Sequence, residues 1–248
     1  MSQAICEHLD WDSHFFGLRI ARVNDAALNS NRLIEALEWG KAGHVDCLYL
    51  LVESDDALST RMVQANGFVL TDVRMTFERA CRGHEASAVG GDSNIIRPAQ
   101  PGDLPALKAI ARVSHTDTRF YSDLNFPRDR CDALYETWIE NSCNGFAQAV
   151  FVAERDQEVC GYVTCHLRNM GSACEAQLGL IAVAEHQRGK GLGKALVNTF
   201  IGWAVQHGAS HLTVITQARN IPAQRLYQQQ GFLTRSVQLW FHYWRCRN

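Results

Sequence analysis

Residues 178–196 read LGLIAVAEHQRGKGLGKAL and decide the fold. Within them, Leu178–Val183 predicts a buried strand, and Gly191–His207 predicts a long helix with one apolar row. The junction combines cations with glycines at alternate positions: Arg188, Gly189, Lys190, Gly191, Leu192, Gly193 and Lys194. Glycines let successive N–H groups converge, and a helix N-terminus favours an anion. The segment therefore predicts a pyrophosphate-binding loop.

This loop differs from two common phosphate-binding loops. A Walker A loop needs the spacing GxxxxGK[ST], which the chain lacks. The alternation Gly189-x-Gly191-x-Gly193 does not fit the GxGxxG spacing of dinucleotide-binding folds either. The alternative interpretation is a tight strand-to-helix turn whose cations are solvated, and the order of the surrounding elements argues against it.

The rest of the chain alternates strands with helices. The residue pattern predicts strands at 95–98, 149–154, 159–165, 212–216 and 237–244, one helix capped by Asp103 and another at 221–230. This order predicts an α/β protein with a mixed sheet. We expect an N-terminal αβ region at 1–80, a linker at 81–93 rich in Gly, Ser and Ala, and a main domain at 94–248.

An internal repeat links the two ends of the chain. Shifted by 164 positions, residues 48–78 align with 212–242 without a gap, and seven pairs are identical: Leu48/Leu212, Arg61/Arg225, Gln64/Gln228, Gly67/Gly231, Phe68/Phe232, Val73/Val237 and Phe77/Phe241. Chance supplies roughly two identities at average residue usage. The N-terminal copy has Val63 in place of Tyr227 and no glycine-rich loop before it, so we infer a degenerate copy. The alternative is that any strand–helix–strand unit ending in Gly-Phe looks alike.

The motifs after residue 94 resemble a known family. Arg-x-x-Gly-x-Gly after a Leu-Ile-Ala-Val strand, then an asparagine and a helix ending in Tyr-x-x-x-Gly-Phe, are similar to the GCN5-related N-acetyltransferase (GNAT) superfamily. The resemblance implies the GNAT fold, a mixed, mostly antiparallel sheet flanked by helices, and acetyl-CoA as co-substrate. It implies that the pyrophosphate binds the loop and that pantetheine pairs with Ile181, Ala182 and Val183. Asn220 and Tyr227 match family positions near the cofactor arm and the thioester sulfur.

A narrower resemblance lies outside the loop. The stretches LDWDSHFFGLRIARV at 9–23, TRFYSDLNFP at 118–127 and LYETWIENS at 134–142 look like acetyltransferases of dTDP-linked amino sugars in cell-surface polysaccharide synthesis. This implies an enzyme that acetylates a dTDP-4-amino-4,6-dideoxyhexose by direct attack through a ternary complex. The alternatives are another small-molecule amine, a protein or peptide amine, or a non-catalytic CoA-binding module.

Acetyl transfer to an amine needs a neutral amine, a stabilised oxyanion and a proton for the departing thiolate. Tyr227 is the candidate acid, with a packing aromatic as the alternative, and a backbone N–H near Ile181 is the candidate oxyanion donor. Glu175, which opens the strand before the loop, is the candidate base. His166 is the second candidate, because an unperturbed imidazole titrates near neutrality. Either of the two can instead be a solvated strand end.

The acceptor is expected to bind the segment Thr118–Pro127. This segment joins a cation to aromatic rings and can pair a diphosphate and stack a pyrimidine: Arg119, Phe120 and Tyr121. The alternative is a surface turn with buried aromatic side chains. Trp11, Phe15 and Phe16 are either core residues or one wall of the acceptor site.

Composition narrows the class of protein. Of 248 residues, 46% are hydrophobic and 20% charged, and 24 Lys and Arg against 26 Asp and Glu give a formal net charge of −2. This composition is globular and lacks the strongly basic balance of nucleic-acid-binding proteins. The longest apolar run, Cys47–Val52, is too short to span a membrane, and the first residues do not resemble a secretory signal.

Cysteine and histidine spacing gives no sign of a metal site. The nine cysteines have no CxxC spacing and the ten histidines no HExxH motif, so reduced thiols and a cytoplasmic location are expected. We therefore expect a small-molecule nucleotide sugar as partner, no nucleic acid, no membrane insertion and no metal. A homodimer is left open.

Overall fold

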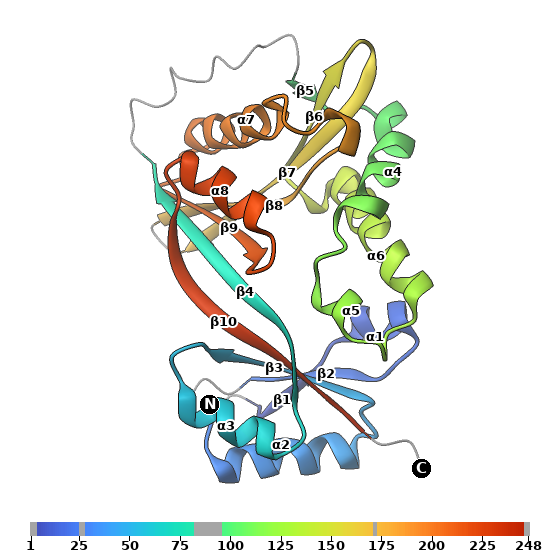
Figure 1. The fold of residues 1–248 in the computed structure, drawn as a ribbon, viewed down its shortest axis with the longest axis vertical. Helices are drawn as coiled ribbons and strands as arrows, with labels where there is room; N and C mark the ends of the chain where they lie inside the picture. The colour runs from blue at the N-terminus through green and yellow to red at the C-terminus, as the bar shows by residue number, and fades with distance from the viewer. Residues whose placement is uncertain (1–3, 25–27, 82–95, 171–172, 246–248) are drawn as a thin grey trace. The chain divides into compact units, whose positions relative to one another are not determined.

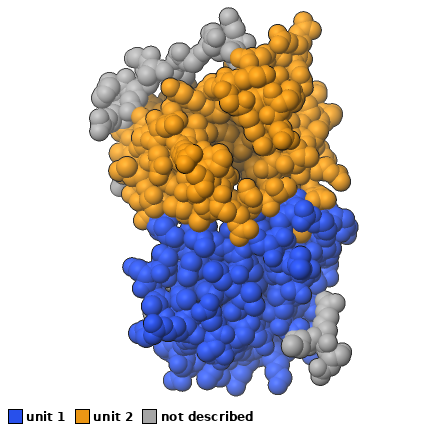
Figure 2. Space-filling model, in the orientation of Figure 1, with its two compact units in different colours: residues 1–74, 118–130, 236–248 blue, residues 75–117, 131–235 orange. Residues whose placement is uncertain are grey.

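The computed structural model describes residues 4–24, 28–81, 96–170 and 173–245. The chain forms two compact units (Figure 2): unit 1 comprises residues 1–74, 118–130 and 236–248, and unit 2 comprises 75–117 and 131–235. Neither unit is continuous in sequence, because two segments that follow the predicted linker fold with unit 1. The linker 81–93 lies outside the described residues except at Cys81, and the predicted domain boundaries remain a prediction.

Unit 2 contains a mixed sheet with the strand order β4-β9-β8-β7-β6-β5 (Figure 1). The strands are β5 (Ile96–Pro98), β6 (Ala149–Arg155), β7 (Glu158–Met170), β8 (Ala173–Val183), β9 (His211–Gln217) and, from Met75 on, β4 (Val69–Ala80). β5 to β8 pair in antiparallel fashion, and β8 pairs with β9 in parallel. The predicted mixed, mostly antiparallel sheet is confirmed.

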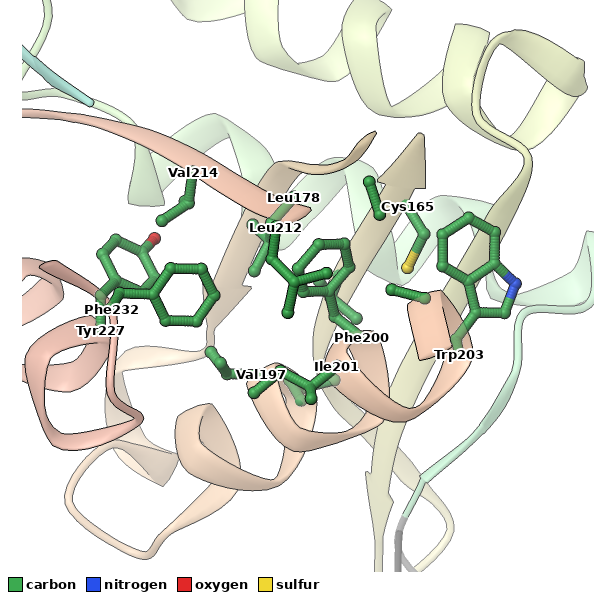
Figure 3. Close-up of a cluster of buried hydrophobic side chains, with 14 of the residues drawn as sticks. Cys165, Leu178, Val197, Phe200, Ile201, Trp203, Leu212, Val214, Tyr227 and Phe232 are labelled. Carbon is green, nitrogen blue, oxygen red and sulfur yellow. The ribbon is translucent and has the colours of Figure 1, made fainter. Parts of the chain in front are cut away.

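Helices pack on both faces of this sheet. They are α4 (Leu104–Ser114), α6 (Arg128–Asn141), α7 (Leu192–Gln206) and α8 (Ile221–Gln229). Residues of α7 and α8 share a buried cluster with Val163 and Leu178 of the sheet (Figure 3). On the other face, His115, just after α4, hydrogen-bonds the Tyr162 hydroxyl at 2.9 Å and stacks on Tyr135 of α6. Alternating side chains of β7 therefore serve two separate helical layers.

The predicted elements are present, and three strands are longer than their apolar runs. β7 extends past the predicted end at residue 165, β8 begins before residue 178, and β10 begins before residue 237. Polar side chains such as His166 and Glu175 end the apolar pattern, although the antiparallel ladder continues through Met170 and Ala173. A search of the described residues finds no helix with the length and apolar character of a membrane span.

Unit 1 contains the first four strands of the sheet order, β1-β2-β3-β10. Its strands are β1 (Cys6–His8), β2 (Ile20–Val23), β3 (Cys47–Glu53) and β10 (Leu233–Trp244), and its helices are α1 (Asp10–Phe16), α2 (Ser30–Ala42), α3 (Ala57–Ala65) and α5 (Arg119–Ser122). Leu48 and Leu50 share a buried cluster with Leu33 of α2 and Val63 of α3. Tyr49, between them on β3, lies on the other face, against Phe126.

The repeat seen in the sequence has a structural counterpart. β3, α3 and β4 at 47–53, 57–65 and 69–80 return as β9, α8 and β10 at 211–217, 221–229 and 233–244, so every bound is shifted by 164 residues. Gly67 and Gly231 occupy equivalent positions after the helices, and both have left-handed backbones, with φ of 85° and 79°. These shared bounds favour a true repeat over a chance likeness.

The two copies exchange their last strands. β10, from the second copy, pairs with β3 of the first, and β4, from the first copy, neighbours β9 of the second. Accordingly Phe241 lies in the core of unit 1, while its counterpart Phe77 lies in the core of unit 2 against Tyr227. Each unit is therefore completed by a strand from the other copy.

Candidate active site

The centre of the candidate site is the point where β8 and β9 stop pairing. The two strands pair from Glu175–His211 to Leu178–Val214. β8 continues to Val183 and β9 to Gln217, yet in the described part of the chain no further pairs join them. Beyond Leu178, β8 therefore has no strand partner on this side.

Two amides of β8, those of Ile181 and Val183, lie on this open edge, as the hydrogen bonds of their neighbours indicate. The N–H of Leu180 donates to Thr164 Oγ1 at 2.8 Å, and the N–H of Ala184 donates to the Cys160 carbonyl at 2.7 Å, both toward β7. Because backbone groups alternate along a strand, the N–H groups of Ile181 and Val183 point to the side that β9 has left. A ligand lying along β8 can pair with these amides as a strand would.

The glycine-rich loop follows directly and forms the N-terminus of α7. Gly191 is the N-cap residue with φ 84°, and Gly189 has φ 76°, both in the left-handed region that favours glycine. The amides of residues 189–194 donate no hydrogen bond within the described chain. Unpaired amides at the start of a 15-residue helix form an anion-binding site.

Cations surround these amides. Arg188, Lys190 and Lys194 are exposed, and Lys190 Nζ donates to the Gln187 side chain at 3.0 Å. Arg188 Nε donates to the Val183 carbonyl at 3.1 Å, which connects the loop to the open edge of β8. The structure thus places the predicted loop and the predicted strand segment next to one another.

Tyr227 lies on the α7–α8 side of the sheet. Its ring is 2% exposed and packs against Phe77 and Phe232, and the hydroxyl points toward Val214, the last β9 residue paired with β8 (Figure 3). Burial raises the pKa of the Tyr227 phenol well above its usual range. The phenol is therefore neutral at physiological pH.

Asn220 is the N-cap residue of α8. Its side-chain oxygen accepts a hydrogen bond from the Ala223 N–H at 3.2 Å and caps α8. A cap fixes where the helix begins, so it also sets the position of Tyr227 two turns later. The family resemblance implies a position for Asn220 near the cofactor arm, which stays a prediction, and the structure shows this capping bond.

His166 lies beside a bulge that the sequence analysis missed. Between Val163 and Cys165 the register shifts, so that Gly179 and Leu180 of β8 face the single residue Thr164 of β7. A Cβ atom at Gly179 would lie 2.5 Å from His166 Nε2 and 2.6 Å from Thr164 Oγ1. The imidazole and the hydroxyl thus lie directly over the glycine, immediately after the last β8–β9 pair.

The electrostatics of His166 favour a neutral ring. Burial, together with Arg168, lowers the pKa of His166 below its usual value, and Thr164 Oγ1 lies 3.3 Å from Nε2. The ring of Phe146 meets the imidazole edge-on at 5.6 Å. One signal was present in the sequence: an isolated glycine within a strand often marks a bulge or a close approach.

Glu175 lies farther from this point. It pairs with His211 three residues before the last β8–β9 pair, about 10 Å away along the strand. Its carboxylate accepts from Thr213 Oγ1 at 3.2 Å and forms an ion pair with Arg235 at 3.4 Å. The structure therefore places His166, and not Glu175, beside the separating strands.

The predicted acceptor segment folds in unit 1. Phe120 is 4% exposed and packs against Phe16 and Phe126. Tyr121 lies under Arg128, whose guanidinium carbon is 4.2 Å from the ring centroid. Arg119 lies over the sheet, close to Tyr49. Among the described residues, no three His, Cys, Asp or Glu side chains are grouped to hold a metal ion.

Comparisons with known proteins show what the chain is similar to. Residues 111–232 match the acetyltransferase (GNAT) family. The dTDP-fucosamine acetyltransferase of Escherichia coli O6:H1 is 28% identical over 97% of this chain and 98% of its own length. The spore coat polysaccharide biosynthesis protein SpsD of Bacillus subtilis is 31% identical over 60% of this chain, which spans only 50% of SpsD.

Two further comparisons concern the shared fold. The peptidyl-lysine N-acetyltransferase YiaC of Escherichia coli K12 is 30% identical over 56% of this chain and 82% of its own length. The solved structure of a GCN5-related N-acetyltransferase from Sphaerobacter thermophilus has a TM-score of 0.63 at 13% identity. That similarity covers 96% of this chain and 76% of the other and concerns the fold alone.

Proposed function

Because the chain belongs to the acetyltransferase (GNAT) family, whose members use acetyl-CoA, we propose that it acetylates the amino group of a dTDP-linked 4-amino-4,6-dideoxyhexose. One observation supports this acceptor above others: the similarity to the dTDP-fucosamine acetyltransferase extends over nearly the whole of both chains and includes unit 1. SpsD, named for polysaccharide biosynthesis, supports the same class of acceptor.

In this proposal the open edge of β8 and the glycine-rich loop bind acetyl-CoA. The donor supplies an acetyl thioester. The unpaired amides at 189–194, with Arg188, Lys190 and Lys194, bind its pyrophosphate. The backbone of Ile181, Ala182 and Val183 takes the place of a strand partner for the pantetheine arm, and the Ile181 N–H stabilises the charge that develops on the thioester oxygen.

Tyr227 gives a proton to the departing thiolate. A phenol near pKa 10 and a thiol near 8.5 differ by about 1.5 units, or roughly 2 kcal/mol. Burial raises the pKa of Tyr227, and the same apolar surroundings raise the pKa of a thiolate, so the difference between them changes less than either value. Proton transfer accompanies breaking of the carbon–sulfur bond, in a direct attack through a ternary complex.

His166 takes a proton from the ammonium group of the acceptor, which leaves a neutral amine to attack the thioester carbonyl, and Glu175 is the alternative base. The lowered pKa keeps His166 unprotonated at neutral pH, as a base must be before it acts. The ion pair with Arg235 and the position of Glu175 favour a structural part for that carboxylate. Thr164 holds the bulge beside His166 through its bond to the Leu180 N–H.

The test is a thiol-release assay with acetyl-CoA and a panel of acceptors. The panel contains dTDP-4-amino-4,6-dideoxyhexoses, simple polyamines and lysine peptides. Turnover with the dTDP-amino sugars at kcat/KM well above that with the other amines supports the proposal. Turnover only on a peptide, the acceptor class named for YiaC, would replace the proposed acceptor. Absence of turnover with every amine, together with acetyl-CoA binding, would identify a non-catalytic module.

A further inference from the structure

Unit 1 holds a guanidinium group in an aromatic cradle. The Arg119 Cζ atom lies 4.3 Å from the ring centroid of Tyr49, 4.3 Å from that of Trp240 and 4.4 Å from that of Phe120. The three rings come from β3, β10 and α5, and Phe120 is itself fixed between Phe16 and Phe126. Ring stacking therefore fixes the position of this cation.

No acid neutralises Arg119 within the described chain. No carboxylate there lies within ion-pair distance of the guanidinium, and its Nη1 atom is buried without a hydrogen-bond partner. Arg97 of unit 2 shows the usual arrangement, with ion pairs to Asp103 and Glu154. An arginine that is held by rings and lacks acid partners keeps its full charge for another anion.

Three further buried polar atoms of this cluster lack partners. The hydroxyls of Tyr49 and Thr118 have no hydrogen-bond partner within the described chain, and neither has Nε2 of His242, whose ring stacks on Tyr49. Buried polar groups are paired in the great majority of cases, so four unpaired atoms in one cluster need an explanation. Their partners must come from outside the described chain, as water or as a ligand.

The carboxylate of Asp123 near this cluster already has hydrogen-bond partners. It bonds to His242 Nδ1 and Trp244 Nε1, both at 2.7 Å, and it also accepts a hydrogen bond from the Asn125 side chain. Burial raises the pKa of Asp12 of α1, while Arg119 and Arg22 lower it. Asp12 forms no ion pair with Arg119 within the described chain.

We propose that Arg119 and its aromatic cradle form a binding site for the diphosphate of a pyrimidine nucleotide. The planar guanidinium, which is only partly buried, pairs phosphate oxygens through its exposed edge. Trp240 provides a partly exposed ring beside it. This inference rests on the proposed acceptor, and it assigns to Trp240 the stacking part that was expected of Phe120 and Tyr121.

The test is direct binding of dTDP to the full chain by calorimetry, without acetyl-CoA. Loss of hydrogen bonds to a charged group predicts that Arg119→Gln weakens dTDP binding about 10- to 100-fold. Arg119→Lys, which keeps the charge but not the fork, should recover part of the affinity. Arg128→Gln is the matched control, since Arg128 also stacks on a tyrosine in this segment but is exposed.

Binding of smaller ligands shows which parts of dTDP the site recognises. We expect dTDP to bind more tightly than dTMP, pyrophosphate or thymidine, and we expect the affinity for acetyl-CoA to be unchanged in every variant. Thermal unfolding of each variant shows whether it is folded, and Arg119→Lys preserves the test if Arg119→Gln is not. Wild-type affinity for dTDP in Arg119→Gln, or no binding of dTDP to the wild type, overturns the proposal. The acceptor panel tests the proposed function independently of this site, because it measures turnover and not the binding of dTDP.

Discussion

The bulge in β8 gives the sharpest test of the site. The change is Gly179→Ala, which adds one methyl group opposite β7. That Cβ would lie 2.5 Å from His166 Nε2 and 2.6 Å from Thr164 Oγ1, distances at which neighbouring atoms must move. The imidazole and the hydroxyl are therefore displaced together, and the Leu180 N–H is separated from its acceptor at Thr164.

The magnitude follows from two effects. Overpacking a close-fitting site costs about 1–3 kcal/mol, and a buried N–H without its acceptor costs about 1–3 kcal/mol. Since the two effects overlap, we expect a loss of about 2–4 kcal/mol, and Tm falls about 2–4 °C per kcal/mol for a chain of this size. We also expect kcat to fall more than the affinity for acetyl-CoA, because His166 is displaced while the loop at 189–194 is not.

Urea unfolding followed by circular dichroism measures the stability, and thiol release measures kcat. Gly102→Ala is the matched control, because nothing lies within 4 Å of a Cβ atom there. We expect this control to stay within about 1 kcal/mol of the wild type, since alanine at a compatible glycine position changes stability little. Wild-type stability together with a wild-type pH–rate profile in Gly179→Ala would refute the placement of His166 and Thr164 over the bulge.

Three other predictions follow from the same contacts. Tyr227→Phe should lower kcat about 10²- to 10⁴-fold, the usual range for a lost general acid, with the Kd for acetyl-CoA unchanged by calorimetry; unchanged turnover would sink this role. In a profile of kcat/KM against pH, the wild type should lose activity as pH falls through the lowered pKa of His166. Glu175→Gln should keep this acidic limb of the profile, and His166→Gln should lose it. The reverse outcome makes Glu175 the base. The free energy of unfolding should fall as pH falls from 6.5 to 4, because burial lowers the pKa of His242 to about 4 and unfolding then takes up a proton. Below pH 4 it should fall further, because the hydrogen bonds to Asp123 outweigh burial and lower its pKa to about 2. Urea unfolding measured at a series of pH values tests both parts, and Asp123→Asn should flatten the second.

Local sequence was enough for the family, the loop and most strands. Alternating glycines, a strand of apolar residues and the Gly-Phe helix end are local signals, and the structure and the comparisons confirm the fold that they imply. The end of β7 was placed too early and the start of β8 too late, because polar side chains on a ladder interrupt the apolar pattern without interrupting the hydrogen bonds.

Long-range contacts could not be derived from the chain in the same way. The ion pair of Glu175 joins it to Arg235, 60 residues away, and no local pattern relates the two. The cradle of Arg119 draws Tyr49 and Trp240 from opposite ends of the sequence. The isolated glycine at 179 was readable as a bulge, but its partner Thr164 is visible only once the register is known.

The exchanged strands also bear on how the chain folds during synthesis. β3 pairs with residues 238–244, so the first copy lacks its outer strand until those residues have left the ribosome. In the second copy, β9 can pair as soon as it emerges, because its neighbour β4 has already been synthesised. An edge of seven mostly buried strand residues, Cys47–Glu53, thus waits through almost 200 residues of translation. Chaperone demand and aggregation of nascent chains should accordingly concentrate on this edge, where unpaired strands are most hazardous.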